Sequence, residues 1–317
     1  MRAVFSPLVL NLLLKVISLL FRRIVFLQSI NIVMESGSNV TSCGCKGIRV
    51  CLQCEANKKQ IKTQALENVA ALFQEYVYCH VCCKAWELLP HPNEHPYHQG
   101  NTIDFPGVCI IPEFVTTHEE KLIVDEIDCS QWKESQSGRL KQDYGPKVNF
   151  KKKKVRMQQF TGLPAFSSDL YKRMISLETL KTFIPVELCN LDYDPSRGSA
   201  IDPHFDDFWL WGERLVTLNL LSDSYLAMTI DYSDERTDAS LQNTLVRIPL
   251  LQRSLVVLQG DARHIWKHSI PRGAIVSRRV AITWRELSDE FQDGGSLCEQ
   301  GKKLIERALS FQGLVVQ

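Results

Sequence analysis

A histidine and an aspartate stand two residues apart within residues 201–221, just ahead of an apolar run that is typical of a core strand. On an extended strand, side chains two residues apart point to the same face, so His204 and Asp206 converge while Phe205 points away. One imidazole nitrogen and one carboxylate oxygen are thus within reach of a single cation. An H-x-D pair is weak evidence alone, because most such pairs are surface pairs without a metal.

A third ligand could come from the segment DARHIWKHSI, residues 261–270, which follows another apolar strand pattern. Its two histidines are His264, in the expected turn, and His268, in the expected strand. Two histidines and one carboxylate that leave coordination positions open form the facial triad of non-haem Fe(II) oxygenases. Open positions are needed because a co-substrate and dioxygen must both reach the metal.

Two arginines six residues apart, Arg279 and Arg285, occur in the strand pattern RRVAITWREL. An even separation places both on one face with Ala281 and Thr283, while valine, isoleucine and tryptophan fill the other face. Guanidinium groups inside a barrel carry a desolvation cost unless carboxylates pair with them. A dicarboxylate co-substrate would supply those carboxylates. The alternative is an exposed edge strand that happens to be basic.

The cysteines are unevenly distributed, with seven of the eleven between residues 43 and 83. In a reducing compartment, close pairs of cysteines more often hold a metal than form disulfides. Four thiolates with C-x-C and C-x2-C spacing could close a tetrahedral zinc site: Cys43, Cys45, Cys51 and Cys54. A second group could add ligands or bind nothing: Cys79, Cys82 and Cys83. Small buried apolar side chains are the alternative for both groups.

Strands must position most of these residues. Short apolar runs separated by turn residues fill residues 185–287, which predicts a sandwich or barrel. We expect a further strand at 105–111, and helices at 61–78, at 116–128 after an N-cap threonine, at 164–177 and near 297–311. The expected fold is mainly β with flanking helices: a double-stranded β-helix, in which two sheets pack as a jelly roll, preceded by a Cys-rich module.

Two polar segments separate these elements. Residues 133–156 are basic and contain glycine, so we expect a loop or lid. Its run of four lysines at 151–154 is either a solvated face or a contact for phosphate or an acidic protein surface. Residues 88–101 contain three prolines and three histidines and are expected to form an extended linker whose histidines decorate a loop rather than bind metal.

The composition of the 317-residue chain gives no global electrostatic case for nucleic acid or acidic membranes, because 37 basic and 36 acidic residues nearly cancel. Residues 1–33 are apolar but interrupted by lysine and arginine, and no uncharged run reaches the roughly 18 residues that span a bilayer. We expect this extension to be a mis-extended start outside the fold; a membrane anchor and a cleaved signal peptide are the alternatives. Residues 34–100 then form the Cys-rich segment and linker, and 101–317 the main domain. We expect no membrane partner.

The motifs NLDY, HFD, RHIWKHSI and RRVAITWRE, in this order between Asn190 and the glutamate after Arg285, resemble the AlkB family of Fe(II)/2-oxoglutarate dioxygenases. The family pattern is H-x-D, then R-x-x-W-x-H-x-I, then R-x5-R. The segments CGCKGIRVCLQCE and SGRLKQDYGPKVNF further resemble its homologue four branch. The resemblance covers nearly everything after Met34.

The resemblance implies roles for single residues, beginning with three iron ligands: His204, Asp206 and His268. It further implies that Arg279, helped by Tyr193, binds the distal carboxylate of 2-oxoglutarate, and that Arg285 lies near the metal-bound end. The family usually has asparagine two residues before this tyrosine. Leu191 stands there in this chain and Asn190 is three residues away, so a cofactor-binding role for Asn190 requires a bulge.

The implied reaction is oxidative N-demethylation, in which 2-oxoglutarate and dioxygen yield succinate and CO2 and a hydroxylated N-methyl carbon leaves as formaldehyde. The branch is associated with methyl-lysine in actin and with N6-methyladenine in DNA. We expect a methylated protein, actin or an actomyosin component, because the lid offers few aromatic side chains to stack a base; DNA bound through the basic lid is second. The resemblance implies a cytoplasmic and nuclear protein. A catalytically silent jelly-roll interaction module is the alternative, disfavoured by the intact triad and arginine pair.

Overall fold

The computed structural model describes residues 45, 51, 52, 54, 73–89, 95–230, 241 and 243–316. All of them belong to residues 43–317, the larger of two units into which the chain divides. The apolar extension at residues 1–33 lies outside the described residues. Among the residues described, no helix is both long and apolar enough to span a membrane.

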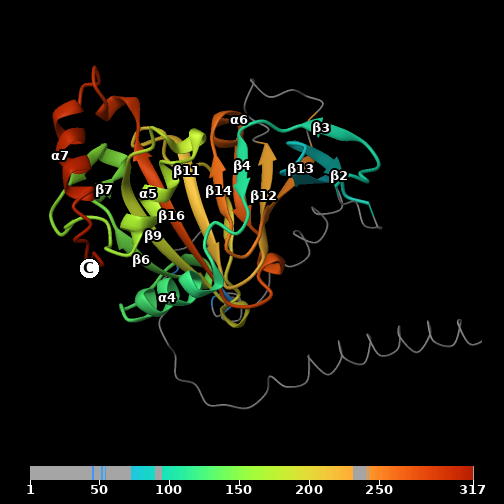
Figure 1. Cartoon of the computed structure of the whole chain (residues 1–317), viewed down its shortest axis with the longest axis horizontal. Helices are drawn as coiled ribbons and strands as arrows, with labels where there is room; N and C mark the ends of the chain where they lie inside the picture. The colour runs from blue at the N-terminus through green and yellow to red at the C-terminus, as the bar shows by residue number, and fades with distance from the viewer. Residues whose placement is uncertain are drawn as a thin grey trace, which may run out of the picture. The chain divides into compact units, whose positions relative to one another are not determined.

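The described residues form two seven-stranded sheets (Figure 1). The first, which we call the histidine sheet, is antiparallel except where β1 pairs with β13 in parallel. Its strands, in spatial order, are β10 (Ile201–His204), β15 (Trp266–Ile270), β12 (Ser224–Ile230), β13 (Thr244–Leu250), β1 (Gln74–Cys79), β2 (Lys84–Glu87) and β3 (Thr102–Asp104).

The second sheet, which we call the arginine sheet, is antiparallel throughout its described strands. Its strands, in spatial order, are β4 (Val108–Ile111), β14 (Leu255–Leu258), β11 (Trp211–Leu220), β16 (Arg279–Leu287), β9 (Pro185–Tyr193), β6 (Leu140–Tyr144) and β5 (Lys133–Glu134).

The two sheets face each other across a shared apolar core. Strand β13 shows how the sequence builds it, since Val246, Ile248 and Leu250 are fully buried and alternate with half-buried residues. The arginine sheet contributes Leu215 from β11 and Ala281 from β16 to the same core. Burial of such apolar surface is the main favourable term in holding the sheets together.

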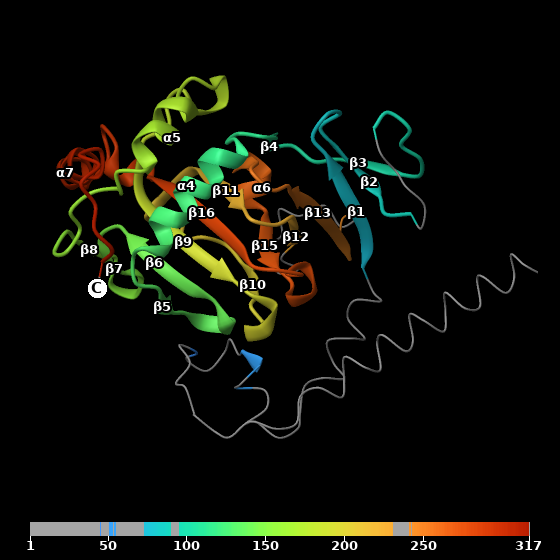
Figure 2. The same cartoon turned by 60° about the horizontal axis from the view of Figure 1, so that its bottom comes forward.

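Three helices cover the other face of the arginine sheet: α4 (Thr117–Asp128), α5 (Ser167–Met174) and α7 (Cys298–Ala308) (Figures 1 and 2). Side chains of β11 and β16 such as Val216, Ile282 and Trp284 are completely buried beneath them. Burial on both faces explains why apolar residues occupy both faces at the centre of each strand. The short helix α6 (Gly260–His264) connects β14 to β15.

The mainly β fold with helices on one face, predicted as a double-stranded β-helix, is confirmed. Each apolar run in residues 185–287 forms a strand, and the helices expected at 116–128, 164–177 and 297–311 are α4, α5 and α7. Helix α4 begins after the expected threonine cap: the Glu119 backbone N–H donates to the Thr116 hydroxyl at 3.2 Å, and the Thr116 N–H donates to the Glu119 carboxylate at 2.7 Å.

The helix predicted over residues 61–78 is wrong at its C-terminal end, because residues 74–78 belong to strand β1. Residues 61–72 lie outside the described residues. Tyr76 and Tyr78 are buried in the core between the sheets, and their period of two fits a strand paired with β13. Tertiary pairing therefore overrides the helical spacing of the preceding residues.

The loop predicted at residues 133–156 is also wrong, and its role as a lid stays a prediction. Strands β5 and β6 belong to the arginine sheet, and β7 (Lys147–Asn149) pairs with β8 (Lys154–Arg156) in a hairpin. Val148 and Val155 of this hairpin pack into the helix-covered core, where the Gln300 amide of α7 donates to the Val155 carbonyl at 3.0 Å. The basic hairpin thus lies on the face of the arginine sheet away from the core between the sheets.

Candidate metal centre and co-substrate site

The structure brings His204, Asp206 and His268 together. His204 at the end of β10 pairs directly with His268 of β15, and the ring centroids are 4.3 Å apart. His204 Nε2 lies 3.6 Å from Asp206 Oδ1, and one potential ligand atom from each residue lies within 4.8 Å of the others. His264 is outside this cluster, with its Nε2 2.9 Å from the Glu213 carboxylate.

Both histidines can present a nitrogen lone pair to a cation. His204 Nδ1 lies 2.8 Å from the Asp202 carbonyl oxygen. Because a carbonyl oxygen only accepts, Nδ1 carries the proton and Nε2 is free to act as a ligand. Burial, followed by the nearby His204, lowers the pKa of His268 to about 3, so this imidazole is neutral near physiological pH.

Asp206 is held as an anion by Arg285. The Arg285 Nε donates to Asp206 Oδ2 at 2.7 Å and its Nη1 donates to Glu187 Oε2 at 2.7 Å. Burial alone would raise the pKa of Asp206, but the Arg285 guanidinium and the two histidines hold it well below its usual range. With Oδ2 occupied by Arg285, Oδ1 is the oxygen that faces the histidines.

Arg279 is a buried guanidinium that lacks an anionic partner. Its side chain is 2% exposed, its Nε donates to Asn219 Oδ1 at 2.5 Å, and its Cζ lies 4.8 Å from the ring centre of Tyr193. Its Nη1 is buried without a hydrogen-bond partner, and within the described part of the chain no carboxylate pairs with it. A buried, unpaired guanidinium is costly, so this position fits the carboxylate of a bound acid.

The two arginines share one face of β16, as their spacing predicted. Arg279 lies opposite Tyr193 of β9 and Arg285 lies opposite Glu187 in a continuous register. Between them on this face are Ala281 and Thr283, whose small side chains separate the two guanidinium groups. The face therefore offers a cation at each end and no bulky residue of β16 between them.

Asn190 does not reach this face. The register of β9 and β16 has no bulge between Glu187 and Tyr193, so Asn190 points to the helix-covered side opposite Ile282. There its amide donates to Gln142 Oε1 at 2.9 Å. Gln142 in turn donates to two carbonyl groups at the end of α4. The cofactor-binding role predicted for Asn190 needed a bulge that the structure lacks, and the residue instead connects the sheet to α4.

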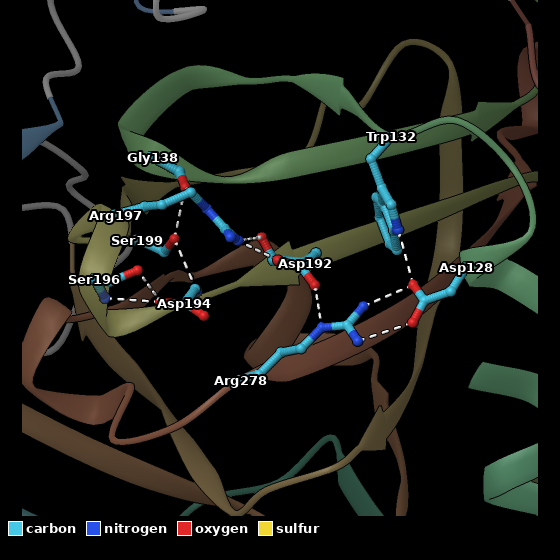
Figure 3. A network of polar contacts seen from close by, with 9 residues as sticks. All are labelled: Asp128, Trp132, Gly138, Asp192, Asp194, Ser196, Arg197, Ser199 and Arg278. Carbon is cyan, nitrogen blue, oxygen red and sulfur yellow. Dashed lines mark hydrogen bonds and ion pairs between the residues drawn. The ribbon is translucent and has the colours of Figure 1, made fainter. Parts of the chain in front are cut away.

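A polar network fixes the ends of β9 and β16 next to Arg279 (Figure 3). Arg278 forms two hydrogen bonds with Asp128, at 2.7 and 2.8 Å, and a third with Asp192 at 2.6 Å. Asp192 is 2% exposed and also pairs with Arg197. Arg278 comes directly before Arg279 at the start of β16, and Asp192 comes directly before Tyr193 in β9. This network therefore sets the positions of Arg279 and Tyr193.

The structure adds three polar residues that the sequence did not single out. Asn219 of β11 orients Arg279, and Glu187 of β9 orients Arg285. Arg263, 1% exposed, donates to the Asp206 backbone carbonyl at 3.2 Å and lies over the Phe208 ring at 4.6 Å. Only Arg263 carries a sequence signal, as the first residue of the R-x-x-W-x-H-x-I pattern. Asn219 and Glu187 sit in apolar strand patterns, where their partners come from distant segments.

The first cysteine group is partly described. Sulfur atoms of Cys45, Cys51 and Cys54 lie within 4.8 Å of one another, and the Ser137 backbone N–H donates to Cys45 Sγ at 3.3 Å. Cys43, the fourth predicted ligand, lies outside the described residues. Three converging thiols suit zinc, which therefore stays a prediction for this group.

The donor set and the unpaired arginine together match one kind of chemistry. Two imidazole nitrogens and one carboxylate oxygen suit Fe(II) and leave positions open, and Arg279 suits the far carboxylate of 2-oxoglutarate. When bound, iron and 2-oxoglutarate would activate dioxygen, which is the oxidant for attack on a C–H bond. The protein holds Asp206 ionised through Arg285, keeps His268 neutral, and surrounds the site with the core between the sheets.

Comparisons with known proteins agree with this chemistry. No protein-family model matches the chain. The chain is 45% identical to the human protein "Alpha-ketoglutarate-dependent dioxygenase alkB homolog 4" over 88% of this chain and 97% of the relative. It is 34% identical to a "DNA N6-methyl adenine demethylase" of Caenorhabditis elegans over 85% of this chain and 95% of the relative. A solved structure of OsALKBH1 matches at 11% identity with a TM-score of 0.39, covering 57% of this chain and 99% of that chain.

Alpha-ketoglutarate is another name for 2-oxoglutarate, the dicarboxylate that Arg279 suits. The two relatives match the chain across almost their whole length, and the human relative does so at nearly half of the aligned positions. The chain therefore belongs to the AlkB family of 2-oxoglutarate-dependent dioxygenases, in the branch of AlkB homolog 4.

Proposed function

We propose that the chain is an oxidative N-demethylase whose substrate is a methyl-lysine of a protein such as actin or an actomyosin component. His204, Asp206 and His268 hold the iron, and Arg279, Tyr193 and Arg285 form the 2-oxoglutarate site. The single observation that carries the proposed chemistry is the buried Arg279 Nη1 without a partner, because a dicarboxylate bound at the iron would satisfy it.

Residues beside the triad support a cationic substrate. The rings of Phe205 and Phe208 are tilted against each other with centroids 5.4 Å apart, and Phe208 is 45% exposed. Both rings take part in cation–π contacts within the chain, with Lys267 at 5.9 Å from the centre of Phe205 and Arg263 at 4.6 Å from that of Phe208. An exposed aromatic face such as that of Phe208 can also attract a methylated ammonium group through cation–π interaction. A methyl-lysine side chain would meet this aromatic pair next to the iron ligands.

Three carboxylates near the triad also favour a cation, although the basic Arg263 and Lys267 stand in the same region. Asp202 and Asp207 lie within three residues of His204, and Glu213 contacts His264 of α6. Asp202 and Glu213 are exposed, and Asp207 is half-buried. Carboxylates at the entrance of a site attract cations and repel a phosphate backbone. The cluster of lysines that could bind phosphate lies on the β7–β8 hairpin, on the helix-covered face of the arginine sheet.

N6-methyladenine in DNA is the second candidate, because the Caenorhabditis elegans relative carries that activity in its name. Demethylation of a base requires it to be flipped out and held by stacking. Phe205 and Phe208 are the aromatic residues near the triad that could stack it. We further propose that the protein works in the cytoplasm and nucleus, where actin and DNA are both present.

A comparison of two substrates tests the proposal. Iron-loaded protein with 2-oxoglutarate and oxygen is given either a methyl-lysine peptide of actin or a DNA strand with N6-methyladenine, and formaldehyde is measured together with succinate. We expect both products in equal amounts with the peptide, and none in His204→Ala. Formaldehyde from DNA alone would establish the second candidate. Absence of succinate under every condition would support the silent interaction module.

A further inference from the structure

We infer that the chain holds a structural zinc ion at a second site, made by two thiols and two imidazoles: Cys79, Cys82, His95 and His98. One ligand atom of each residue lies within 4.8 Å of the other three. Two sulfur and two nitrogen donors in this arrangement match the tetrahedral Cys2His2 shell that zinc prefers in structural sites. The histidines, expected from the sequence to decorate a linker, belong to this cluster.

The strand pairing explains how the thiols converge. β1 and β2 form a hairpin in which Cys79, the last residue of β1, pairs with Lys84, the first of β2. Cys82 lies in the turn between them, and Cys83 adopts a positive φ of 55° that turns the chain back. A C-x2-C pair on a tight turn places both sulfur atoms on the same side, as zinc sites require.

The spacing along the chain agrees with the geometry. The four residues form the pattern C-x2-C-x12-H-x2-H. This matches zinc sites of the C-x2-C and distal histidine type in all but the last interval, which is one residue shorter than usual. The short interval explains why the pattern did not stand out in the sequence.

Trp86 of β2 supports two of the four ligands. Its indole Nε1 donates to Cys82 Sγ at 3.2 Å, and its ring stacks on His98 with centroids 4.7 Å apart and planes at 14°. A hydrogen bond to sulfur stabilises the thiolate form that binds zinc. The stacking fixes the plane of the His98 imidazole. One side chain thus orients a sulfur and a nitrogen ligand for the same ion.

The ion would join the outer strands of the histidine sheet. β2 and β3 have only four and three residues, and β1 attaches them to the dioxygenase core by its parallel pairing with β13. A zinc ion bound by both Cys82 and His95 would join the turn between β1 and β2 to the segment before β3. It would thereby stabilise the edge of the sheet that β2 and β3 form. The site is separated from the iron ligands by β12 and β13, and shares no residue with the Cys45 group.

Paired substitutions in the full chain test the inference. Zinc per chain is measured in metal-replete Cys82→Ser and in Cys83→Ser, its neighbour outside the cluster. A second pair is His98→Ala with His80→Ala, a histidine of the turn between β1 and β2 that is not in the cluster. We expect Cys82→Ser and His98→Ala to lose one zinc ion relative to their controls. Equal zinc content within both pairs would overturn the inference.

X-ray absorption separates this site from the other cysteine group. In a chain with Cys45, Cys51 and Cys54 replaced by serine, we expect zinc with two sulfur neighbours at about 2.3 Å and two nitrogen neighbours at about 2.0–2.1 Å. Cys82→His should keep the ion with one sulfur and three nitrogens, which distinguishes ligation from a failure to fold. A zinc-free protein, or a shell of sulfur alone, contradicts the inference.

Discussion

The two carboxylate oxygens of Asp206 have different neighbours: one accepts a hydrogen bond from Arg285, and the other faces the two histidines. Such an arrangement makes the aspartate a ligand through one oxygen and leaves room for other ligands on the metal. Arg285, predicted from family resemblance to lie near the metal-bound end of 2-oxoglutarate, contacts Asp206, the carboxylate that we propose as a metal ligand. Its contribution to iron binding is therefore measurable without any substrate.

Arg285→Ala should weaken iron binding by about 10- to 100-fold, because Asp206 loses the group that orients it. Arg285→Lys should retain part of the affinity, since one ammonium cannot reproduce the fork that spans Asp206 and Glu187. Anaerobic titration of Fe(II) against a competing chelator measures the effect. Glu187→Gln is the matched control, with a smaller loss, because it removes only the charge of the other partner of Arg285 and leaves the contact with Asp206 in place. Unchanged affinity in Arg285→Ala would show that Asp206 does not depend on it.

Arg279→Ala should weaken 2-oxoglutarate binding by roughly a hundredfold or more, since an unpaired buried carboxylate costs on the order of 3–5 kcal/mol. Arg279→Lys should rescue only part, because an ammonium cannot make two parallel hydrogen bonds. The measurement is a titration of 2-oxoglutarate into iron-loaded protein without oxygen. Iron binding should persist in both variants, as β16 supplies no ligand. The same 2-oxoglutarate affinity in Arg279→Ala and wild type would contradict the assignment.

Successive side chains of a strand point to opposite faces, and this alternation decided what could be predicted for single residues. It correctly placed Arg279 with Arg285 on one face of β16, because they are six residues apart. His204 and Asp206 also converge, but Asp206 lies just beyond the end of β10, so strand alternation does not account for its position. The same rule puts Asn190 on the other face from Tyr193, three residues away. Asn219 could not have been found this way, since its partner Arg279 is 60 positions distant and only the folded sheet brings them together.

At the scale of elements, apolar runs with strong local signals were identified correctly, and elements that depend on distant partners were not. Strand β6 reads as a basic loop, yet Gln142 within it is fully buried because α4 and β9 satisfy its amide. Strand β1 continues a helical pattern but pairs with β13, which is far away in the sequence. Tertiary context overrode local preference in both segments.

Helices α4 and α5 are joined by an ion pair whose effect depends on pH. Arg173 of α5 donates to the Glu119 carboxylate in the cap of α4, and this contact, followed by the Thr116 N–H, lowers the pKa of Glu119 to about 2. The folded pKa lies below the unfolded value of about 4.3. The ionised pair therefore contributes its full stabilisation above that unfolded value, and loses it as the pH falls toward 2.

Glu119→Gln removes the charge but keeps an oxygen that can accept from Thr116. Because both side chains of the pair are about a third exposed, we expect a loss of about 1 kcal/mol in the free energy of unfolding at pH 7. The difference from wild type should shrink as the pH falls below about 4. Urea midpoints at pH 7 and pH 3 provide the comparison. A constant difference at both pH values would mean that the lost stability does not come from the ion pair.

At the scale of the whole molecule, two sheets carry separate parts of the chemistry. The histidine sheet supplies His204 and His268, and the arginine sheet supplies Arg279 and Arg285. Only the packing of the sheets brings Arg285 against Asp206. The sequence could predict the strands within residues 185–287 and the jelly roll, but not which sheet each strand joins. It could not predict the cluster of Cys79, Cys82, His95 and His98, because a hairpin and a linker assemble it.

Succinate formed from 2-oxoglutarate, measured in the first turnover after oxygen is admitted to iron-loaded protein, tests the central claim most directly. Two histidines four residues apart serve as site and control, because His268 faces Asp206 and His264 contacts Glu213. Wild type and His264→Ala should both form succinate, and His268→Ala should form none. Succinate from His268→Ala, or its loss in His264→Ala with the fold intact, would contradict the iron site described for this chain.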